Sequence, residues 1–330
     1  MHIPDGFVDG KTAVATAALA AVGLAVALRN VRLSFPPRRV PLIGLAAAFV
    51  FAAQMLNFPV AGGTSGHLIG GVLAAVLLGP SAAVVVLSSV LILQCLLFAD
   101  GGLTALGANL FSMALVAPVV GYGVYSLVRR AGGGSLRSRL LAAAFAAWCS
   151  VVAAAVACAG ELAASGTVAW GVALPAMAGV HMLVGLGEAA ITALVVAAVA
   201  GVRPELVRDA DAARGPRYGA LAAYGLLISV GLVLFVAPFA SGLPDGLESF
   251  LAALGFEARA AAPPLLSSPL PDYTVPGLGR AVPATVLAGA IGTVVAFGLA
   301  YLLARLLTPR APAAPRRDVG AAVPPAAAST

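Results

Sequence analysis

Long apolar runs separated by short polar segments dominate the chain. Most runs extend over about 18 to 30 residues, the length at which a helix crosses a bilayer. Strands of a membrane barrel would instead alternate apolar and polar positions over about 10 residues. The pattern predicts helices near 12–28, 41–58, 67–79, 81–99, 109–128, 140–160, 168–201, 218–240 and 281–308.

Two of these predicted helices are unusual in length. The run 67–79 is short and ends at Gly79-Pro80, so we expect it to pack inside a bundle without reaching full bilayer thickness. The run 168–201 is long and contains Pro175 and Gly179, which is compatible with one kinked helix or two short ones. We count it as one.

The composition supports an integral membrane protein. Of 330 residues, 61% are hydrophobic and only 10% are charged, whereas a soluble domain is nearer a quarter charged. The predicted fold class is therefore all-α, a polytopic membrane helical bundle. Cys95, Cys149 and Cys158 lie in apolar runs without C-x-x-C spacing, which favours neither a disulfide framework nor a zinc ribbon.

Basic residues predict how the bundle is oriented. Four arginines fall in each of the segments 29–40, 129–139, 202–217 and the tail from 305, which together hold 16 of the 19 basic residues. The positive-inside rule places these segments in the cytoplasm, with the N-terminus outside the plasma membrane and the C-terminus inside. The net charge of +6 is then a topology signal and not a sign of nucleic-acid binding. Most acidic residues fall outside, which suits an arriving cation but also suits outer loops in general.

The N-terminal residues are a candidate metal chelate. No positive segment precedes the first apolar run, so we expect no cleaved signal peptide, and a large second residue favours retention of Met1. The free amine, the amide nitrogen of His2 and its imidazole Nδ1 are able to close adjacent rings on Ni(II), Cu(II) or Co(II). A solvated histidine without a role is the alternative reading of His2.

A fourth nitrogen is expected from His67, because it lies in a Gly-rich outer turn on the same side as the N-terminus. Pro4 and Gly6 favour a turn that folds the terminus back into the mouth of the bundle. Such a site needs side chains that orient the rings. Candidates at matching depth are Asn57, Thr64, Ser65, Asp100 and Asn109.

Several motifs of this chain resemble one family as a set. They are MHIPDGF at 1–7, QMLNFPV and GGTSGHLIGG within 54–71, LLFADGGLTALGANLFSM at 96–113 and HMLVGLGEAAIT at 181–192. They are similar to the CbiM/NikM family, the cobalt/nickel substrate-binding membrane component of energy-coupling factor transporters. The resemblance implies a seven-helix bundle over 1–202 and an extracytoplasmic metal site at Met1, His2 and His67.

The same resemblance implies a substrate and partners. Co(II) or Ni(II) would be transported, with no bound cofactor. Two cytoplasmic ATPase subunits and a transmembrane coupling (T) subunit would act with this chain in the lipid bilayer. The chain itself lacks a nucleotide site, because Gly10-Lys11-Thr12 has Asp5 where a P-loop needs its first glycine, and no strand precedes it.

A second resemblance covers the C-terminal part. LPDGLESFLAALGF at 243–256 and SPLPDYTVPGLG at 268–279 resemble the PDGLE module of a small accessory subunit (CbiN/NikN-like), which has two spans around an outer loop. We therefore divide the chain into the metal-binding bundle, a cytoplasmic linker, a fused accessory module and a disordered cytoplasmic tail, over 1–202, 203–217, 218–308 and 309–330. Asp245, Glu248 and Asp272 either recruit cations or order the loop, with a helix starting near Gly246; we favour the ordering role.

His181 and Glu188 are polar residues within a predicted span. Seven residues correspond to two helical turns, or roughly 10 Å, so the two side chains share a face without touching. A charged carboxylate within a membrane is costly unless it is neutral or paired. We favour a polar clamp between helices over a secondary metal stop on the way inward.

A different function class also fits part of the sequence. Gly63-Thr64-Ser65-Gly66 matches the GxSG of rhomboid intramembrane proteases, and His181 is compatible with their base. Such a dyad requires a serine hydroxyl hydrogen-bonded to an imidazole. This hypothesis predicts a Ser65–His181 contact and leaves MHIPDG unexplained.

Overall fold

Helices make up most of the computed structural model, which describes residues 1–207, 218–256, 265, 267–278 and 281–308. Seven helical segments of this part are long and apolar enough to cross a membrane. They are Gly10–Ser34, Pro80–Phe98, Leu106–Gly132, Leu136–Ala164, Trp170–Val202, Gly219–Phe239 and Val282–Leu307. The predicted helical bundle is confirmed, with one short hairpin as an exception to the all-α class. The predicted tail 309–330 and most of the predicted linker lie outside the described residues.

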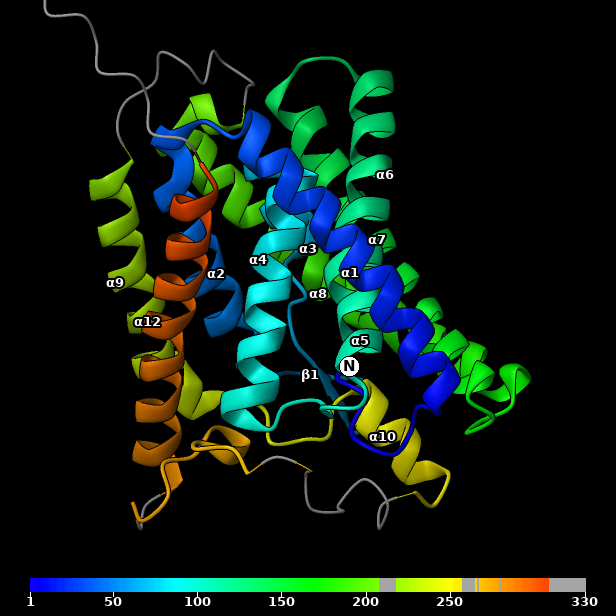
Figure 1. The fold of residues 1–330 in the computed structure, drawn as a ribbon. Coiled ribbons are helices and arrows are strands. Elements are labelled where there is room, and N and C mark those ends of the chain that lie inside the picture. The colour runs from blue at the N-terminus through cyan, green and yellow to red at the C-terminus, as the bar shows by residue number, and fades with distance from the viewer. Residues whose placement is uncertain (208–217, 257–264, 266, 279–280, 309–330) are drawn as a thin grey trace, which may run out of the picture.

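The part of the chain before residue 203 forms seven helical segments when helices joined by a π-helical turn are counted as one. Figure 1 shows their arrangement. Helix α4 continues into a π-helical turn, and α5 continues through a second π-helical turn into α6. Such turns are frequent at functional sites, and here they flank the loop 99–105 that meets the N-terminal residues. The elements are α1 (Gly10–Ser34), a 3-10 turn (Pro37–Arg39), α2 (Val40–Gln54), α3 (Gly71–Leu78), α4 (Pro80–Leu93), the first π-turn (Gln94–Phe98), α5 (Leu106–Asn109), the second π-turn (Leu110–Val116), α6 (Ala117–Gly132), α7 (Leu136–Ala164) and α8 (Trp170–Val202).

The segment after α2 departs from the hydropathy prediction. The helix predicted over 41–58 ends at Gln54, and an antiparallel hairpin of β1 (Phe58–Val60) and β2 (Thr64–Gly66) follows. Gly62 and Gly63 adopt positive φ at the tip, where residues with side chains are disfavoured. The helix predicted from residue 67 begins only at Gly71. His67 therefore directly follows a strand.

Helix α8 is one continuous helix from Trp170 to Val202, although Pro175 lies within it. This agrees with the count of one helix for the long seventh run. A 3-10 turn at Pro204–Leu206 follows. His181 and Glu188 both lie on the buried face of α8.

The C-terminal helices pack against the first part of the chain. They are α9 (Gly219–Val236), a 3-10 turn (Ala237–Phe239), α10 (Gly246–Ala253), a second 3-10 turn (Pro271–Tyr273) and α12 (Ala281–Leu307). Helix α12 contacts α2 and α9. Glycine allows this close approach, since a Cβ on Gly292 would overlap the Phe51 ring. The two parts thus form one bundle.

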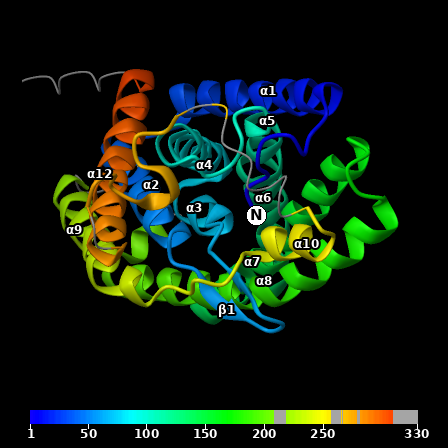
Figure 2. The ribbon, with the colours of Figure 1, turned by 90° about the horizontal axis from the view of Figure 1, so that it is seen from below.

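The two ends of the bundle carry different groups. The N-terminus, the β1–β2 hairpin and α10 lie at the lower end in Figure 1, and the connections after α1, α6 and α8 lie at the upper end. Seen from below, the N-terminus lies near the centre, surrounded by α3, α5, α7 and α10 (Figure 2). The described arginines that lie in or beside these connections and the candidate site are thus at opposite ends of the helices.

Candidate metal site

The first seven residues enter the mouth of the bundle, as the turn-forming residues among them predict. Met1, Ile3 and Phe7 are buried. The carboxylate of Asp5 accepts hydrogen bonds from the backbone N–H and the hydroxyl of Thr104, at 2.8 and 2.7 Å. The N-terminal segment is therefore held inside the protein by both apolar and polar contacts.

Asn109 anchors the backbone of this segment. Its Oδ1 accepts from the N–H of Ile3 at 2.8 Å, and its Nδ2 donates to the carbonyl of Ile3 at 3.1 Å. The N–H of Gly102 donates to the same carbonyl at 2.9 Å. A Cβ on Gly102 would overlap the backbone of Asp5, so a glycine is needed for this approach. Residues 1 and 2 are thereby placed next to the hairpin.

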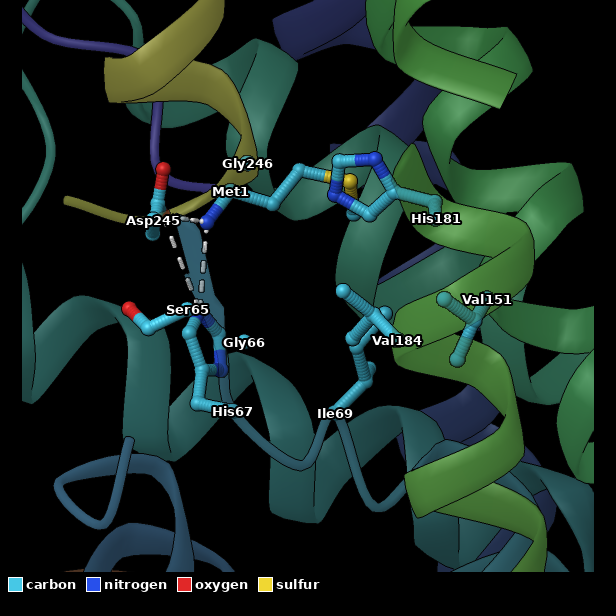
Figure 3. Close-up of a pocket in the computed structure, with 10 residues that line it drawn as sticks. All are labelled: Met1, Ser65, Gly66, His67, Ile69, Val151, His181, Val184, Asp245 and Gly246. Carbon is cyan, nitrogen blue, oxygen red and sulfur yellow. Dashed lines mark hydrogen bonds and ion pairs between the residues drawn. The ribbon is translucent and has the colours of Figure 1, made fainter. Parts of the chain in front are cut away.

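The amine of Met1 lies between a histidine and a carboxylate. It is 3.1 Å from Nε2 of His67, and it also contacts the carboxylate of Asp245 (Figure 3). Nδ1 of His67 is 3.1 Å from the carbonyl of Leu68, an acceptor to which Nδ1–H donates. Nε2 then carries the lone pair, which is the form of the ring that binds a metal ion.

Burial and charge set the protonation of these groups. Burial lowers the pKa of His67, and the positive amine of Met1 lowers it further, so the ring is neutral. Burial also lowers the pKa of the Met1 amine, but the charge of Asp245 and its hydrogen bond outweigh burial, and the net pKa is raised. Burial raises the pKa of Asp245, and the nearby amine more than reverses this, so the carboxyl is ionised.

The imidazole of His2 lies beside the Met1 amine and the imidazole of His67. Its ring stacks on that of His67 with centroids 5.4 Å apart and planes at 22°. Its Nδ1 lies 3.1 Å from Oδ1 of Asp100, and burial lowers its pKa, so Nδ1–H donates to the carboxylate. Nε2 is buried and has no hydrogen-bond partner among the described residues. Asp100 thus holds Nδ1, the ring nitrogen through which the chelate is predicted.

Asp245 has two roles at this position. It is the N-cap of α10 and forms a capping box with Glu248, so these two of the three acidic residues order the loop as predicted, and the helix starts at Gly246. Its contact with the Met1 amine was not predicted. A D-x-x-E pattern signals a helix cap locally, whereas no pattern marks a contact across 244 positions.

The five residues predicted to orient the rings divide into two groups. Asp100 and Asn109 hold His2 and Ile3, as described above. The hydroxyls of Thr64 and Ser65 instead donate to the carbonyls of Leu243 and Pro244, and the backbone carbonyl of Asn57 accepts from Ser241. These hydrogen bonds tie the hairpin to the segment before α10.

His181 and Glu188 act at different places and do not bond to each other. The carboxylate of Glu188 accepts from the backbone N–H groups of Ile69 and Gly70 at 2.6 and 2.8 Å. Glu188 is thus a clamp between α8 and the chain that leads from His67 into α3. The Nδ1–H of His181 donates to the carbonyl of Met177 within its own helix at 2.7 Å.

A cavity of about 10 Å³ lies next to the amine, room for about one water-sized sphere. Met1, His67, Asp245 and His181 contribute to its wall, together with apolar side chains (Figure 3). Within the described part of the chain, no three His, Cys, Asp or Glu side chains are arranged to hold a metal ion.

Comparison with known proteins identifies the family. The family model for the cobalt uptake substrate-specific transmembrane region, CbiM, matches residues 2–206. The chain belongs to the CbiM family. The PDGLE domain matches residues 219–309, so this CbiM-family chain also carries the module that its sequence resembles.

Relatives share this combination over nearly their whole length. A protein of Archaeoglobus fulgidus, provisionally named fused nickel transport protein NikMN, is 40% identical over 92% of this chain and 98% of the relative. Fused nickel transport protein NikMN of Rhodobacter capsulatus is 35% identical over 94% of this chain and all of the relative. The crystal structure of a transition metal transporter aligns with a TM-score of 0.58 and 38% identity, covering 65% of this chain and all of that one.

Membership of the CbiM family decides the function class. The chain is a multi-pass membrane protein of a nickel/cobalt transport family, whose named relatives are transport proteins and not enzymes. The protease hypothesis also lacks its central contact, because the Ser65 hydroxyl donates to the carbonyl of Leu243 at 2.7 Å and His181 donates to Met177.

Proposed function

We propose that this chain is the substrate-binding membrane subunit of an energy-coupling factor importer, which captures Co(II) or Ni(II) at the outer face of the plasma membrane. One observation carries the proposal: the amine of Met1 and Nε2 of His67 are 3.1 Å apart, beside the ring of His2. Two nitrogens bound at right angles, each about 2.0–2.1 Å from one metal ion, lie roughly 2.9 Å apart. The hydrogen-bonded separation of 3.1 Å is close to this spacing, which supports a shared ion in place of the amine proton.

The chemistry of the three residues suits these metals. Imidazole nitrogens are good ligands for Ni(II) and for neighbouring divalent metals, and both rings are neutral here because burial lowers their pKa values. Nε2 of His2 has no hydrogen-bond partner in the described part of the chain, so it is the ring nitrogen that Asp100 leaves available. The chelate through the His2 amide and Nδ1 requires the ring to turn away from Asp100.

The charge distribution supports entry from outside. The described arginines at the ends of α1, α6 and α8, in the turn before α2 and at the start of α7 lie at the end opposite the site. With the positive-inside rule, the site and the N-terminus are then extracytoplasmic and the end of α12 is cytoplasmic. Asp100, Asp245 and Glu248 make the surroundings of the site acidic, which attracts a cation.

Transport against a gradient requires an energy source that this sequence lacks. We therefore propose that two cytoplasmic ATPase subunits and a transmembrane coupling subunit act with the chain, as its resemblance to energy-coupling factor components implies. The metal is then the transported substrate and not a resident cofactor. The fused PDGLE part, residues 218–308, is the accessory module.

Calorimetric titration of Ni(II) and Co(II) into the purified full chain tests the amine. The variant carries Met-Glu before Met1, which moves the amine away from His67; the second residue is large, so the added methionine is retained. The matched control carries the same two residues at the C-terminus. We expect the N-terminal extension to abolish binding and the control to bind as the unmodified chain does.

His67→Ala tests the second ligand in the same titration. We expect it to weaken binding strongly, because it removes a ligand without a substitute within reach. Tight Ni(II) binding by both the extended chain and His67→Ala would show that the proposed site is wrong.

A further inference from the structure

A tyrosine of the C-terminal part reaches the metal site through Asp100. The hydroxyl of Tyr273 donates to Oδ2 of Asp100 at 2.5 Å. The other oxygen of the same carboxylate, Oδ1, faces Nδ1 of His2 at 3.1 Å. The three side chains therefore form one hydrogen-bonded line from residues 218–308 to the imidazole of His2.

Other contacts hold Tyr273 in this position. Its ring stacks on that of Phe98, with centroids 4.7 Å apart and planes at 20°. The ring centroid of Phe51 lies 6.0 Å from that of Tyr273. Gln94 donates to the hydroxyl oxygen at 3.1 Å, so the hydroxyl hydrogen is left for Asp100. Nearby, the N–H of Leu270 donates to the carbonyl of Leu97 at 3.0 Å.

The backbone at Tyr273 is itself unusual. Asp272 and Tyr273 have φ of 50° and 54°, in the left-handed region that residues with side chains seldom adopt. Consecutive strained residues persist where surrounding contacts determine them. The Tyr273 side chain is surrounded by such contacts, with Phe98, Gln94 and Asp100.

We propose that Tyr273 is a positioning residue for the metal site, which fixes the Asp100 carboxylate and through it the imidazole of His2. A carboxylate held by one partner rotates about its last side-chain bond, whereas Asp100 is held at both oxygens. Partners that orient a ligating histidine commonly change metal affinity by about 10–100-fold when removed. The inference rests on the proposed function, since it requires His2 to be a ligand through Nε2 while Nδ1 stays on Asp100.

Tyr273→Phe in the full chain removes only the hydroxyl and keeps the ring stacked on Phe98. We expect Ni(II) affinity to fall about tenfold, the lower end of the range for such partners, with a shift of the Ni(II) d–d absorption band. Tyr301→Phe is the matched control, because Tyr301 is a tyrosine of α12 that stacks on Phe297 and is not in contact with this line of residues. It should leave both affinity and spectrum unchanged.

A double-mutant cycle with Asp100→Asn separates positioning from general stability. Tyr273 acts through Asp100, so Tyr273→Phe should have no further effect on affinity once Asp100→Asn is present. Additive losses, or a Tyr273→Phe affinity within twofold of the unmodified chain while His67→Ala abolishes binding, would overturn the positioning role and leave the metal site standing. Unchanged binding by His67→Ala would overturn the site itself.

Discussion

The carboxylate of Asp245 contacts the amine of Met1, which is 244 positions away in the chain. The same carboxylate caps α10, so one side chain ties the start of the accessory helix to the start of the protein. A metal ion that binds the amine must take the place of the proton that this contact stabilises.

Metal affinity should rise with pH, and Asp245→Asn should shift that rise to lower pH. Burial lowers the pKa of the Met1 amine, but Asp245, with smaller contributions from Asp100 and Glu248, raises it overall. Binding that displaces one proton weakens by about tenfold per pH unit below that pKa. Asparagine keeps the helix cap but not the charge, so the amine then loses its proton at lower pH.

Titration of Ni(II) into both chains between pH 6 and 9 measures this shift. Glu248→Gln is the control, since it removes a carboxylate from the same helix that has no bond to the amine. Glu248→Gln should shift the pH dependence of Ni(II) affinity less than Asp245→Asn does. Superimposable profiles for the unmodified chain and Asp245→Asn contradict the role of Asp245.

Gly102→Ala should impair metal binding. The added Cβ would overlap the backbone of Asp5 and push the N-terminal segment off Asn109. The amine of Met1 then no longer lies next to His67. Gly123→Ala, at a position with open space around the new Cβ, should bind Ni(II) normally in the same assay. Equal affinities for the two variants argue against a fixed N-terminal segment.

Glu188→Leu should lower the thermal stability of the protein in detergent. Two buried N–H groups, those of Ile69 and Gly70, lose their acceptors, at about 1–3 kcal/mol each. Thr192→Val, one turn further along α8, is the control, because the Thr192 hydroxyl is buried without a partner in the described part of the chain. If the thermal unfolding midpoint of Glu188→Leu equals that of Thr192→Val, the role of Glu188 as a clamp is contradicted.

Nickel should bind more tightly than cobalt at equilibrium. Nitrogen ligands follow the order in which Ni(II) exceeds Co(II). Competition between the two ions on the purified chain measures the ratio. A preference for cobalt would require a geometry that selects against nickel.

The spans were predictable because membrane helices are defined by run length and hydropathy. Hydropathy fails at Phe58–Val60, which is apolar but belongs to a strand, since Gly62 and Gly63 allow the chain to reverse there. The approach of Met1 to His67 was predictable because histidines are scarce, and two of the three, His2 and His67, are predicted on the same side. The contacts of Asp245 and Tyr273 were not, because they depend on how the C-terminal part packs on the bundle. The orientation of the His2 ring was not predictable either, because it depends on its contact with Asp100.

A crystal structure of the nickel-loaded full chain, with anomalous scattering at the nickel edge, tests the central claim most directly. The account predicts one peak within bonding distance of the Met1 amine, Nε2 of His67 and the His2 imidazole, with Asp245 withdrawn from the amine. A peak at Asp245 and Glu248 with the amine unbound, or a peak elsewhere in the bundle, would contradict it.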